Sequence, residues 1–426
     1  MIKILKYGEV SSGEIFSRAV PQADVRAIVS KIIDDVRKNG DEALYRYSEK
    51  FDKANLQSLQ VTKAEIEEAL NKTDKEFIKI LEEAARNITL FHTKQKRDGF
   101  KIQKENGVII GQKVMPVNCA GLYVPGGTAA YPSTVLMDAI PAKIAGCKNV
   151  VMVTPPAPDG SVNPVILAAA SVAGVDKIFR IGGAQAIAAL AFGTESVPKA
   201  DKIVGPGNAF VAEAKRQVYG EVSIDMIAGP SEIMIVADEK NDPSHLAADL
   251  LSQAEHDKLA TAVLITDSNS LANAVLAEIE KQLPELLRSE IARAAIDNNS
   301  KIIVTEDLNT ALTLANEIAP EHLELCLDNP FEYLEKVENA GSVFLGRNCP
   351  EALGDYFAGP NHTLPTSGTA KFSSPLSVDD FIKKTQFTYY TKEALREVSN
   401  KVARFALTEG LTAHAKSAII RTEETK

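Results

Sequence analysis

The feature that most constrains the fold is a regular alternation of short apolar strands and helices between residues 119 and 237. Each predicted strand is followed by a turn and then by a helix with apolar residues at helical spacing. A helix that crosses over between two parallel strands builds a parallel, doubly wound sheet. The predicted strands are 120–124, 150–154, 177–181, 202–204 and 232–236, and the predicted helices are 133–144, 164–173, 185–192 and 209–218.

Three of the strand-to-helix turns are rich in glycine, at 126–127, 182–183 and 205–207. Glycine lets the backbone approach a phosphate or a ribose closely, and ligands of such sheets lie at the carboxyl ends of the strands. The complete dinucleotide fingerprint G-x-G-x-x-G is absent, and the nearest sequence is GPGNAF at 205–210. The spacing alone therefore gives a weak indication of NAD binding.

A second alternating series begins at residue 243 and predicts a second α/β unit. Its predicted helices are 243–256, 270–283, 284–296 and 310–318, and its predicted strands are 262–266, 301–305, 323–327 and 342–345. Before the first series, helical spacing is found over 21–38, where Gly40 is a stop signal, and over 75–96. Because these early helices have no sheet of their own, we expect the first hundred residues to pack with the second unit.

Local signals complete this prediction. Thr62 and Glu65 form a capping box, a short strand pair is expected around 101–112, and the tail from about residue 379 is predicted to be helical, with Gly410 at a C-cap and Thr412 at the next N-cap. The fold class is therefore α/β, with two doubly wound (Rossmann-like) α/β domains, a helical N-terminal arm and a helical C-terminal tail. The expected division is an arm of 1–20, a first α/β domain of 21–118 plus 238–378, an inserted domain of 119–237 and a tail of 379–426.

Composition excludes several classes of protein. A formal net charge of −10 suits a phosphate backbone poorly, so we expect no nucleic-acid partner. The apolar runs are too short to span a membrane, and the first residues lack the pattern of a signal peptide. The four cysteines form no C-x-x-C pair and are typical of reduced thiols. These features predict a soluble cytoplasmic protein without a membrane partner.

Gln253 and His256 lie in SQAEH at the end of a predicted helix, three residues apart and therefore on one face. An amide oxygen and a neutral imidazole could both bind a metal there. The alternative is a solvated helix end, where a histidine suits the helix dipole. Taken alone, this pair favours the solvated helix end.

Asp355 and His362 lie in GDYFAGPNHTLPT, where glycines and prolines predict a shaped loop. The carboxylate and the imidazole could converge on a cation, or the loop could be a turn whose polar side chains cap the local backbone. Glu321 and His322 follow Pro320 at the entrance to a strand, on a β-α edge of the kind where active sites are common. There His322 could act as a general base and Glu321 could activate water, or both could belong to an exposed turn.

Two further segments are weaker candidates on their own. Glu409 and His414 lie in TEGLTAH between the two predicted tail helices, where a solvated helical tail is the simpler interpretation. Ser231 lies in AGPSE before a strand and could bind a substrate by a hydrogen bond, but the G-x-S-x-G motif of a nucleophilic serine is absent. The residues themselves thus predict a soluble α/β protein with a plausible metal site and ligand loops, and name no reaction.

Taken together, these segments resemble the histidinol dehydrogenase family. The resemblance covers nearly the whole chain from about residue 20, in order, which makes it highly specific. The matching stretches are GLYVPGG (121–127), GGAQAIAALAFG (182–193), GPGNAFVAEAKR (205–216), DMIAGPSEIMIVAD (225–238), DLLSQAEH (249–256), APEHLEL (319–325), GDYFAGPNHTLPT (354–366) and TEGLTAH (408–414).

The resemblance implies one Zn²⁺ per subunit, held by Gln253, His256, Asp355 and His414 of the partner subunit, and therefore a homodimer with shared active sites. It implies NAD⁺ contacts at Tyr123, Gln185 and Asn208 in the inserted domain. The substrate contacts that it implies are Ser231, Gln253, His256, Glu321, His322, Asp355, His362, Glu409 and His414. The tail would then contribute to the partner's active site.

The implied reaction is the last step of histidine biosynthesis, in which L-histidinol is oxidised to L-histidine through histidinaldehyde with two NAD⁺. His322 would accept the alcohol proton while hydride leaves, and Glu321 would activate water to hydrate the aldehyde. Three alternatives remain: a related zinc- and NAD-dependent dehydrogenase of another amino or sulfonated alcohol, a zinc hydrolase, and a non-catalytic metabolite-binding protein. Manganese and cobalt accept the same ligand types as zinc.

Overall fold

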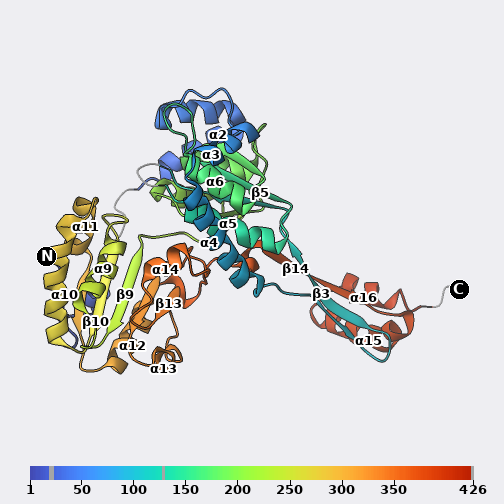
Figure 1. Ribbon diagram of the computed structural model, residues 1–426. Helices are drawn as coiled ribbons and strands as arrows, with labels where there is room; N and C mark the ends of the chain where they lie inside the picture. The colour runs from blue at the N-terminus through green and yellow to red at the C-terminus, as the bar shows by residue number, and fades with distance from the viewer. Residues whose placement is uncertain (19–23, 127–129, 424–426) are drawn as a thin grey trace. The chain divides into compact units, whose positions relative to one another are not determined.

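The structure is a computed structural model that describes residues 1–18, 24–126 and 130–423. The chain divides into a main unit of Met1–Gln95 and Val117–Phe381 and a small unit of Lys96–Pro116 and Ile382–Lys426 (Figure 1). None of the helices in these described stretches combines the length and the apolar character that crossing a lipid bilayer would need.

The first sheet of the main unit has five parallel strands in the order β6-β5-β4-β7-β8. The chain winds outward from β4 in one direction and then returns to wind in the other, so a switch point lies between β4 and β7. The strands are β4 (Cys119–Tyr123), β5 (Asn149–Thr154), β6 (Lys177–Arg180), β7 (Lys202–Val204) and β8 (Ser223–Ile224). The crossover helices are α5 (Pro132–Ala145), α6 (Pro164–Ala173), α7 (Gly183–Phe192) and α8 (Ala209–Val218).

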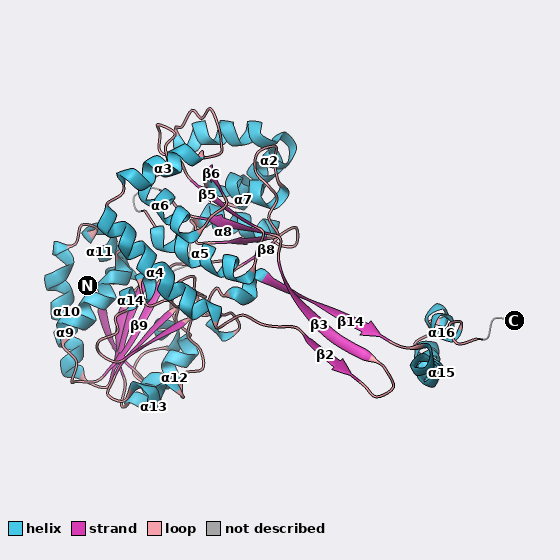
Figure 2. Cartoon of the chain, turned by 45° about the vertical axis from the view of Figure 1, so that its right-hand side comes forward, coloured by secondary structure: helices cyan, strands magenta, loops and turns pink. Residues whose placement is uncertain are grey.

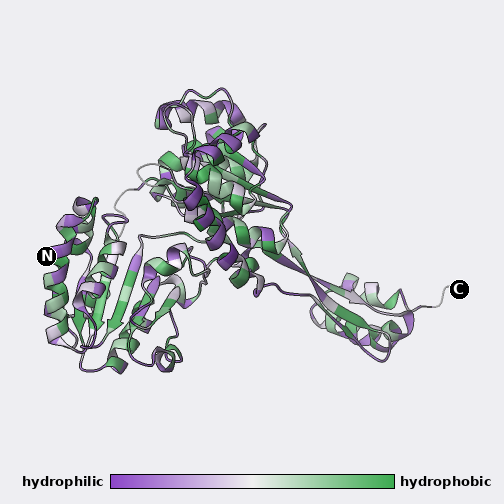
Figure 3. Ribbon diagram, viewed as in Figure 1, coloured by the Kyte–Doolittle hydropathy of each residue, from purple (hydrophilic) through white to green (hydrophobic). Residues whose placement is uncertain are grey.

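The second sheet has six parallel strands in the order β1-β11-β10-β9-β12-β13 and is wound in the same way, with its switch point between β9 and β12 (Figure 2). Its strands are hydrophobic over most of their length, as expected of a sheet covered on both faces (Figure 3). The strands are β1 (Lys3–Lys6), β9 (Glu232–Ala237), β10 (Thr261–Thr266), β11 (Lys301–Val304), β12 (His322–Cys326) and β13 (Ser342–Leu345).

Helices cover both faces of this second sheet. One face packs against α9 (Pro243–Ala254), α10 (Asn269–Gln282) and α11 (Ser289–Asn298), and the other against α1 (Ser12–Ile15) and α12 (Leu308–Ile318). The shorter elements are α13 (Pro330–Leu334), α14 (Glu351–Tyr356), η2 (Leu283–Glu285), η3 (Thr369–Lys371) and η4 (Val378–Phe381). Two doubly wound parallel sheets confirm the predicted fold class.

The predicted strand 232–236 belongs to a different sheet from the one expected. It forms β9 at the centre of the six-stranded sheet, and the five-stranded sheet is instead closed by β8, which was not predicted. The boundary at 237 between two predicted domains is therefore wrong. A buried apolar strand has the same sequence pattern in any parallel sheet, and a two-residue strand has no detectable pattern.

The expectation that the first hundred residues pack with the second unit is also wrong for their helices, α2 (Arg26–Tyr47), α3 (Lys63–Lys72) and α4 (Lys75–Thr93). Val29 and Ile32 of α2 share a core with Ile187 of α7, and Leu81 of α4 shares one with Leu136 of α5. Helices α5 to α7 are apolar on nearly every side, so the five-stranded sheet needs an outer helical layer.

Local predictions in this region have mixed outcomes. The capping box of Thr62 and Glu65 is confirmed at the start of α3. Gly40 interrupts the helical backbone with a φ of 52°, but α2 resumes beyond it and is followed by η1 (Ser48–Asp52). The predicted helix start at 21–23 lies outside the described residues, as does the end of the arm at 19–20. The arm is not simply helical, because β1 joins the edge of the six-stranded sheet.

The small unit contains a three-stranded antiparallel sheet of β2 (Phe100–Gln103), β3 (Ile109–Pro116) and β14 (Ile382–Tyr389), followed by α15 (Lys392–Thr408) and α16 (Thr412–Ile419). The strand pair was predicted, whereas the wholly helical tail is wrong, because Ile382–Tyr389 forms β14 and pairs with β3 along its whole length. Gly410 has the positive φ of a helix terminus. Thr412 is inside α16 rather than its N-cap.

Candidate active site

The centre of the candidate site is the pair Glu321 and His322, whose side chains are both buried. Helix α12 ends at Ala319, which has the left-handed backbone (φ 53°) that only a strongly held non-glycine residue adopts. Pro320 then leads into β12, which begins at His322. The pair therefore lies at the amino edge of the six-stranded sheet, whereas active sites of parallel sheets usually lie at the carboxyl edge, as the sequence interpretation assumed.

The backbone of the neighbouring strand holds both side chains. The N–H of Glu232, the first residue of β9, donates to Oε2 of Glu321 at 2.8 Å. Nδ1 of His322 lies 3.0 Å from the carbonyl oxygen of Glu232. A carbonyl can only accept, so Nδ1 carries the proton and Nε2 is the nitrogen available for chemistry.

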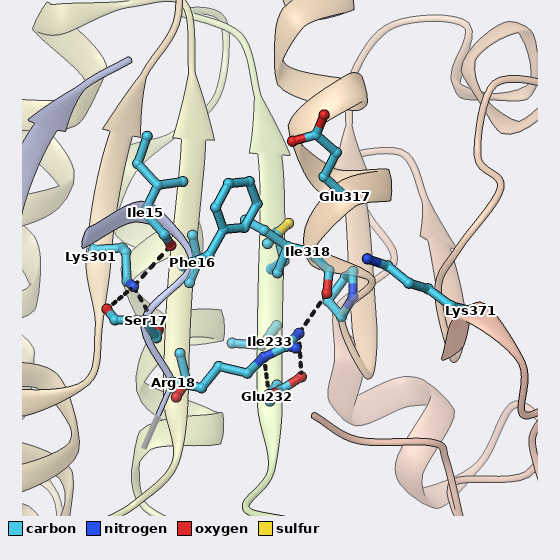
Figure 4. A pocket seen from close by; sticks show the side chains of 14 residues that line it. Ile15, Phe16, Ser17, Arg18, Glu232, Ile233, Lys301, Glu317, Ile318 and Lys371 are labelled. Carbon is cyan, nitrogen blue, oxygen red and sulfur yellow. Dashed lines mark hydrogen bonds and ion pairs between the residues drawn. The ribbon is translucent and has the colours of Figure 1, made fainter. Parts of the chain in front are cut away.

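An arginine clamps the segments on either side of this pair (Figure 4). Arg18 donates from Nη2 to the carbonyl oxygen of Ile318 at 2.6 Å, and its Nε lies 2.9 Å from Oε1 of Glu232. Arg18 thus links the end of α12 to the start of β9. The first of these segments leads into Glu321 and His322, and the second forms hydrogen bonds to both of their side chains. Arg18 also lines a cavity of about 450 Å³.

The same cavity contains a second buried cation, Lys301 (Figure 4). Its Nζ donates to the carbonyl oxygens of Glu14, Ile15 and Ser17 at 2.9–3.1 Å. Burial, with the charges of Arg18 and Lys3, lowers the pKa of Lys301 to about 8. Because its donors are used by the backbone, Lys301 fastens the arm to the sheet.

Three potential metal ligands lie close together: His322, Glu351 and Asp355. Nε2 of His322 lies 3.6 Å from Oδ1 of Asp355 and 3.9 Å from Oε1 of Glu351, and one ligand atom from each of the three lies within 4.8 Å of the others. Glu351 and Asp355 lie four residues apart on α14, where a helix places both on one face. Asp355 thus belongs to a helix, which corrects the prediction of an irregular loop at this position.

The pKa values reflect this concentration of charge. Burial opposes ionisation of Asp355, but the adjacent imidazole of His322 and the charge of His362 lower its pKa. Burial alone would lower the pKa of His322, and the carboxylates of Glu321 and Asp355 outweigh it and raise the pKa to about 10. Burial raises the pKa of Glu321 to about 8 and that of Glu351 to about 8. The site therefore buries three carboxyl groups, Glu321, Glu351 and Asp355, around one imidazole, and burial holds two of the carboxyl groups in their neutral form near pH 7.

Gln253 and His256 are two further potential donors from the end of α9, and His256 interacts with the charges of Asp355 and His322. Gln253 lies in the last turn of α9 with 1% of its side chain exposed, and His256 follows the end of that helix. Burial lowers the pKa of His256. The charge of His322 acts in the same direction, and the negative charge of Asp355 opposes both effects. In the described part of the chain, Oε1 of Gln253, Nε2 of His322 and Oε1 of Glu351 are buried without a hydrogen-bond partner. Unpaired buried polar atoms are costly, and a divalent cation among N and O donors would satisfy them.

His362 lines a small cavity together with His322 and Asp355. Its Nδ1 donates to the carbonyl oxygen of Asp355 at 3.0 Å, and its Nε2 lies 3.4 Å from the hydroxyl of Thr134. Burial lowers the pKa of His362, against the opposite effect of Asp355. A cavity of about 110 Å³ is lined by His322, Asp355 and His362 together with Phe344. Ser231 precedes Glu232 and is partly exposed at the same amino edge.

Tyr123, Gln185 and Asn208 lie at the carboxyl edge of the five-stranded sheet. Tyr123 ends β4, and its hydroxyl accepts from the N–H of Gly183 at 3.1 Å. Gln185 is buried in the first turn of α7. Asn208 is the N-cap of α8 and accepts from two backbone N–H groups. Tyr123 and Asn208 flank the switch point between β4 and β7, whereas Gln185 follows the edge strand β6. Residue 127 of the first glycine turn lies outside the described residues.

Glu409 and His414 belong to the small unit, where Glu409 follows α15 and His414 lies on α16, and both are exposed. Within the main unit, the other candidates form two groups, one at the edge with His322 and one at the edge with Tyr123.

Comparison with known proteins decides what kind of site this is. The model of the family described as histidinol dehydrogenase matches residues 17–422. The chain belongs to the histidinol dehydrogenase family. This confirms the resemblance noted from the motifs and places the protein among oxidoreductases.

Relatives within the histidinol dehydrogenase family match over almost their whole length. The chain is 54% identical over 426 residues to histidinol dehydrogenase of Clostridium acetobutylicum, covering 99% of each. It is 56% identical over 400 residues to that of Bacillus cereus, covering 94% of this chain and 93% of the relative. The crystal structure of histidinol dehydrogenase from Elizabethkingia anophelis has a TM-score of 0.94 at 40% identity, covering 99% of this chain and 98% of that one.

Sequence reasoning missed three residues of the candidate site, namely Glu351, Glu232 and Arg18. The four-residue spacing of Glu351 and Asp355 was a detectable signal, but the nearby glycines and prolines favoured a loop. Glu232 acts through its backbone and Arg18 through a contact 214 residues away, so neither had a local signal.

Proposed function

We propose that the protein oxidises L-histidinol to L-histidine through histidinaldehyde, using two NAD⁺ per turnover. The observation that carries this proposal is the buried His322, with Nδ1 fixed by Glu232 and Nε2 directed at Asp355, in a chain of the histidinol dehydrogenase family. A fixed imidazole with one free nitrogen is suited to accept the proton of an alcohol.

The proposed resident metal is one Zn²⁺ per subunit, held by Gln253, His256, Asp355 and His414 of the partner subunit. The unpaired Oε1 of Gln253 and the cluster of His322, Glu351 and Asp355 support a cation at this position. When bound, zinc would orient the substrate and neutralise the carboxylates that raise the pKa of His322. The imidazole would then be neutral near pH 7 and able to act as a base.

The chain's own residues then divide the work. His322 accepts the alcohol proton at Nε2 while hydride leaves for NAD⁺. Glu321, whose Oε2 is held by the Glu232 N–H, activates water to hydrate the aldehyde, and His322 assists the second oxidation. The burial of both side chains keeps bulk water from the reactive aldehyde. Ser231 and His362 bind the substrate from the same edge.

The proposed NAD⁺ site is the carboxyl edge of the five-stranded sheet, at Tyr123, Gln185 and Asn208. Helices α7 and α8 both begin at this edge, and the partial positive charge of their N-termini favours a pyrophosphate. This arrangement would replace the missing fingerprint. In this division of the main unit, the six-stranded sheet carries the metal and catalytic residues and the five-stranded sheet carries the cofactor.

The proposed assembly is a cytoplasmic homodimer in which the tail of each subunit contributes Glu409 and His414 to the other's site. Exposed apolar side chains on the tail helices support a subunit contact there, because such patches are usually covered. They are Val402, Phe405, Leu407 and Leu411.

The direct experiment mixes purified protein with L-histidinol and NAD⁺ and counts the NADH formed for each L-histidinol consumed. The expected ratio is two. A ratio of one, or oxidation of only another amino or sulfonated alcohol, would favour the related dehydrogenase. Hydrolytic activity without NADH would favour the zinc hydrolase.

A further inference from the structure

A second buried polar cluster lies on the five-stranded side of the main unit and shares no residue with the donor cluster around His322. It contains Asp138 on α5, Lys215 on α8 and Asp225 after β8, and at most 2% of each side chain is exposed. Groups of this kind are seldom buried without a reason, and neither the sequence motifs nor the proposed chemistry accounts for Asp138.

The cluster has two carboxyl groups and one ammonium group. Lys215 forms an ion pair with Asp225 and donates to the carbonyl oxygen of Gly205 at 2.9 Å. Asp225 also accepts from the N–H groups of Gly205 at 2.8 Å and of Met226 at 2.6 Å. Asp225 therefore has the contacts of an anion, and the single positive charge is used to balance it.

Asp138 has no such contacts. Its Oδ1 accepts from the hydroxyl of Thr363 at 3.1 Å, and its Oδ2 has no hydrogen-bond partner among the described residues. Burial, followed by the charge of Asp225, raises the pKa of Asp138 well above its usual range. A completely buried carboxylate without a cation is unfavourable, and such a group takes up a proton instead.

The helix that carries Asp138 contacts the loop that carries His362 along one face. Met137 and Asp138 lie three and four residues after Thr134 on α5, so both lie on the side of the helix that carries Thr134. The hydroxyl of Thr134 lies 3.4 Å from Nε2 of His362. The backbone carbonyl oxygen of Met137 accepts from the side-chain amide of Asn361 at 2.7 Å, and Oδ1 of Asp138 accepts from the hydroxyl of Thr363 at 3.1 Å.

On its other side Asp138 touches the glycine turn that ends at Asn208. A Cβ added to Gly205 would lie 2.9 Å from Oδ2 of Asp138 and would overlap the carbonyl oxygen of Tyr123. Gly205 also has a φ of 112°, so the turn requires glycine for conformation and for space. Asp138 thus lies between a turn at the carboxyl edge and the loop of His362.

We propose that Asp138 is a positioning residue that acts as a neutral carboxylic acid and holds the 205–208 turn in register with the 361–363 loop. The role of these two segments rests on the proposed function, in which one binds NAD⁺ and the other the substrate. The protonation of Asp138 and its contacts do not depend on that function.

Matched amide substitutions at the two carboxyl groups test the assignment of charge. Asp138→Asn keeps the size, an acceptor and the absence of charge, so the melting temperature should stay within about 3 °C of the unmodified protein. Asp225→Asn leaves Lys215 buried without its anion and should lower the melting temperature on the order of 10 °C. Equal losses in the two variants would overturn the assignment.

Infrared spectroscopy tests the proton directly and requires no activity. The difference spectrum between the unmodified protein and Asp138→Asn at pH 7 should contain the C=O stretch of one protonated carboxyl group. A carboxylate band in its place would overturn the proposal, whatever substrate the enzyme takes.

Kinetics test the positioning role. Asp138→Ala removes the link between turn and loop and should lower kcat/KM for NAD⁺ and for L-histidinol by about 10- to 100-fold. Asp138→Asn should restore both. If Asp138→Ala changes only the melting temperature, with kcat and both KM values unchanged, Asp138 is structural and the positioning role is wrong. If no variant oxidises L-histidinol, the proposed function fails, while the melting and infrared results still decide the charge state.

Discussion

The two parallel sheets of the main unit are wound in the same way but carry their candidate residues at opposite edges. Tyr123 ends strand β4 of the first sheet, and Asn208 is the N-cap of α8, the helix that follows the neighbouring strand β7. His322 begins strand β12 of the second sheet, and Gln253 lies in the last turn of α9, the helix that precedes strand β10. One edge therefore collects helix N-termini and the other collects helix C-termini.

This difference explains which ligand suits each edge. Helix N-termini carry partial positive charge and free N–H groups, which favour the pyrophosphate of a dinucleotide. Helix C-termini carry partial negative charge, and with Glu351 and Asp355 they favour a cation. One winding pattern can thus serve two ligands of opposite charge, depending on the edge that is used.

The sharpest test of the amino edge is His322→Asn. Loss of a general base should lower kcat by about 10²- to 10⁴-fold, while zinc content measured by atomic absorption stays the same. The matched control is His245→Asn, an exposed histidine at the start of α9, which should leave kcat unchanged. A His322→Asn enzyme with full kcat would remove the catalytic role from this edge.

Arg18→Met tests whether the amino edge depends on its clamp. It leaves the buried Glu232 carboxylate unpaired, so we expect a loss of about 3 kcal/mol in the free energy of unfolding. The substitution should also lower kcat, measured well below the melting temperature, because Glu232 and Ile318 hold the catalytic pair. Arg18→Lys should recover part of both, and an unchanged kcat in the folded Met variant would contradict a positioning role.

Lys301 gives the same edge a dependence on pH. Its folded pKa, about 8, is below the ordinary lysine pKa of 10.5, so between these pH values the unfolded chain binds more protons than the folded one. Stability should therefore rise with pH across this window and fall as pH drops toward 8, by about 3 kcal/mol at most. Urea titrations of the unmodified protein and of Lys301→Met should diverge in that direction, and parallel curves would show that Lys301 is not perturbed.

Glu351→Gln tests whether the donor cluster extends beyond the residues implied by the family. Removing a charged neighbour of the metal position should weaken zinc binding by about 10- to 100-fold, measured by competition with a chelator. Glu324→Gln is a useful comparison, since Glu324 accepts from the Glu351 N–H but is not in the cluster. An unchanged zinc affinity in Glu351→Gln would place the ion elsewhere.

Tyr123→Phe tests the carboxyl edge and should have the smallest effect. It removes one hydrogen bond to Gly183, which corresponds to about 1 kcal/mol and about a fivefold rise in KM for NAD⁺. The KM for L-histidinol should stay unchanged. A selective rise in the KM for L-histidinol would mean that the ligands of the two edges are assigned the wrong way round.

The candidate site was predictable to different degrees for identifiable reasons. Gln253, His256, Glu321, His322, Asp355 and His362 were found from motifs, because each pair is close in sequence. Glu351 was missed because nearby glycines concealed a short helix. Arg18 and Asp138 were missed because their partners, Glu232 and Thr363, are more than 200 residues away.

The amino-acid sequence by itself determined the class of fold, the family and most bounds of helices and strands, because hydrophobic periodicity, glycine turns and motifs are local properties. Only the tertiary structure decided that β9 belongs to the second sheet, that α2 to α4 cover the first, and that His322 lies at an amino edge. These facts depend on which buried surfaces meet. An apolar strand or helix face has the same pattern wherever it packs, so its partner is fixed by the three-dimensional arrangement of the whole chain.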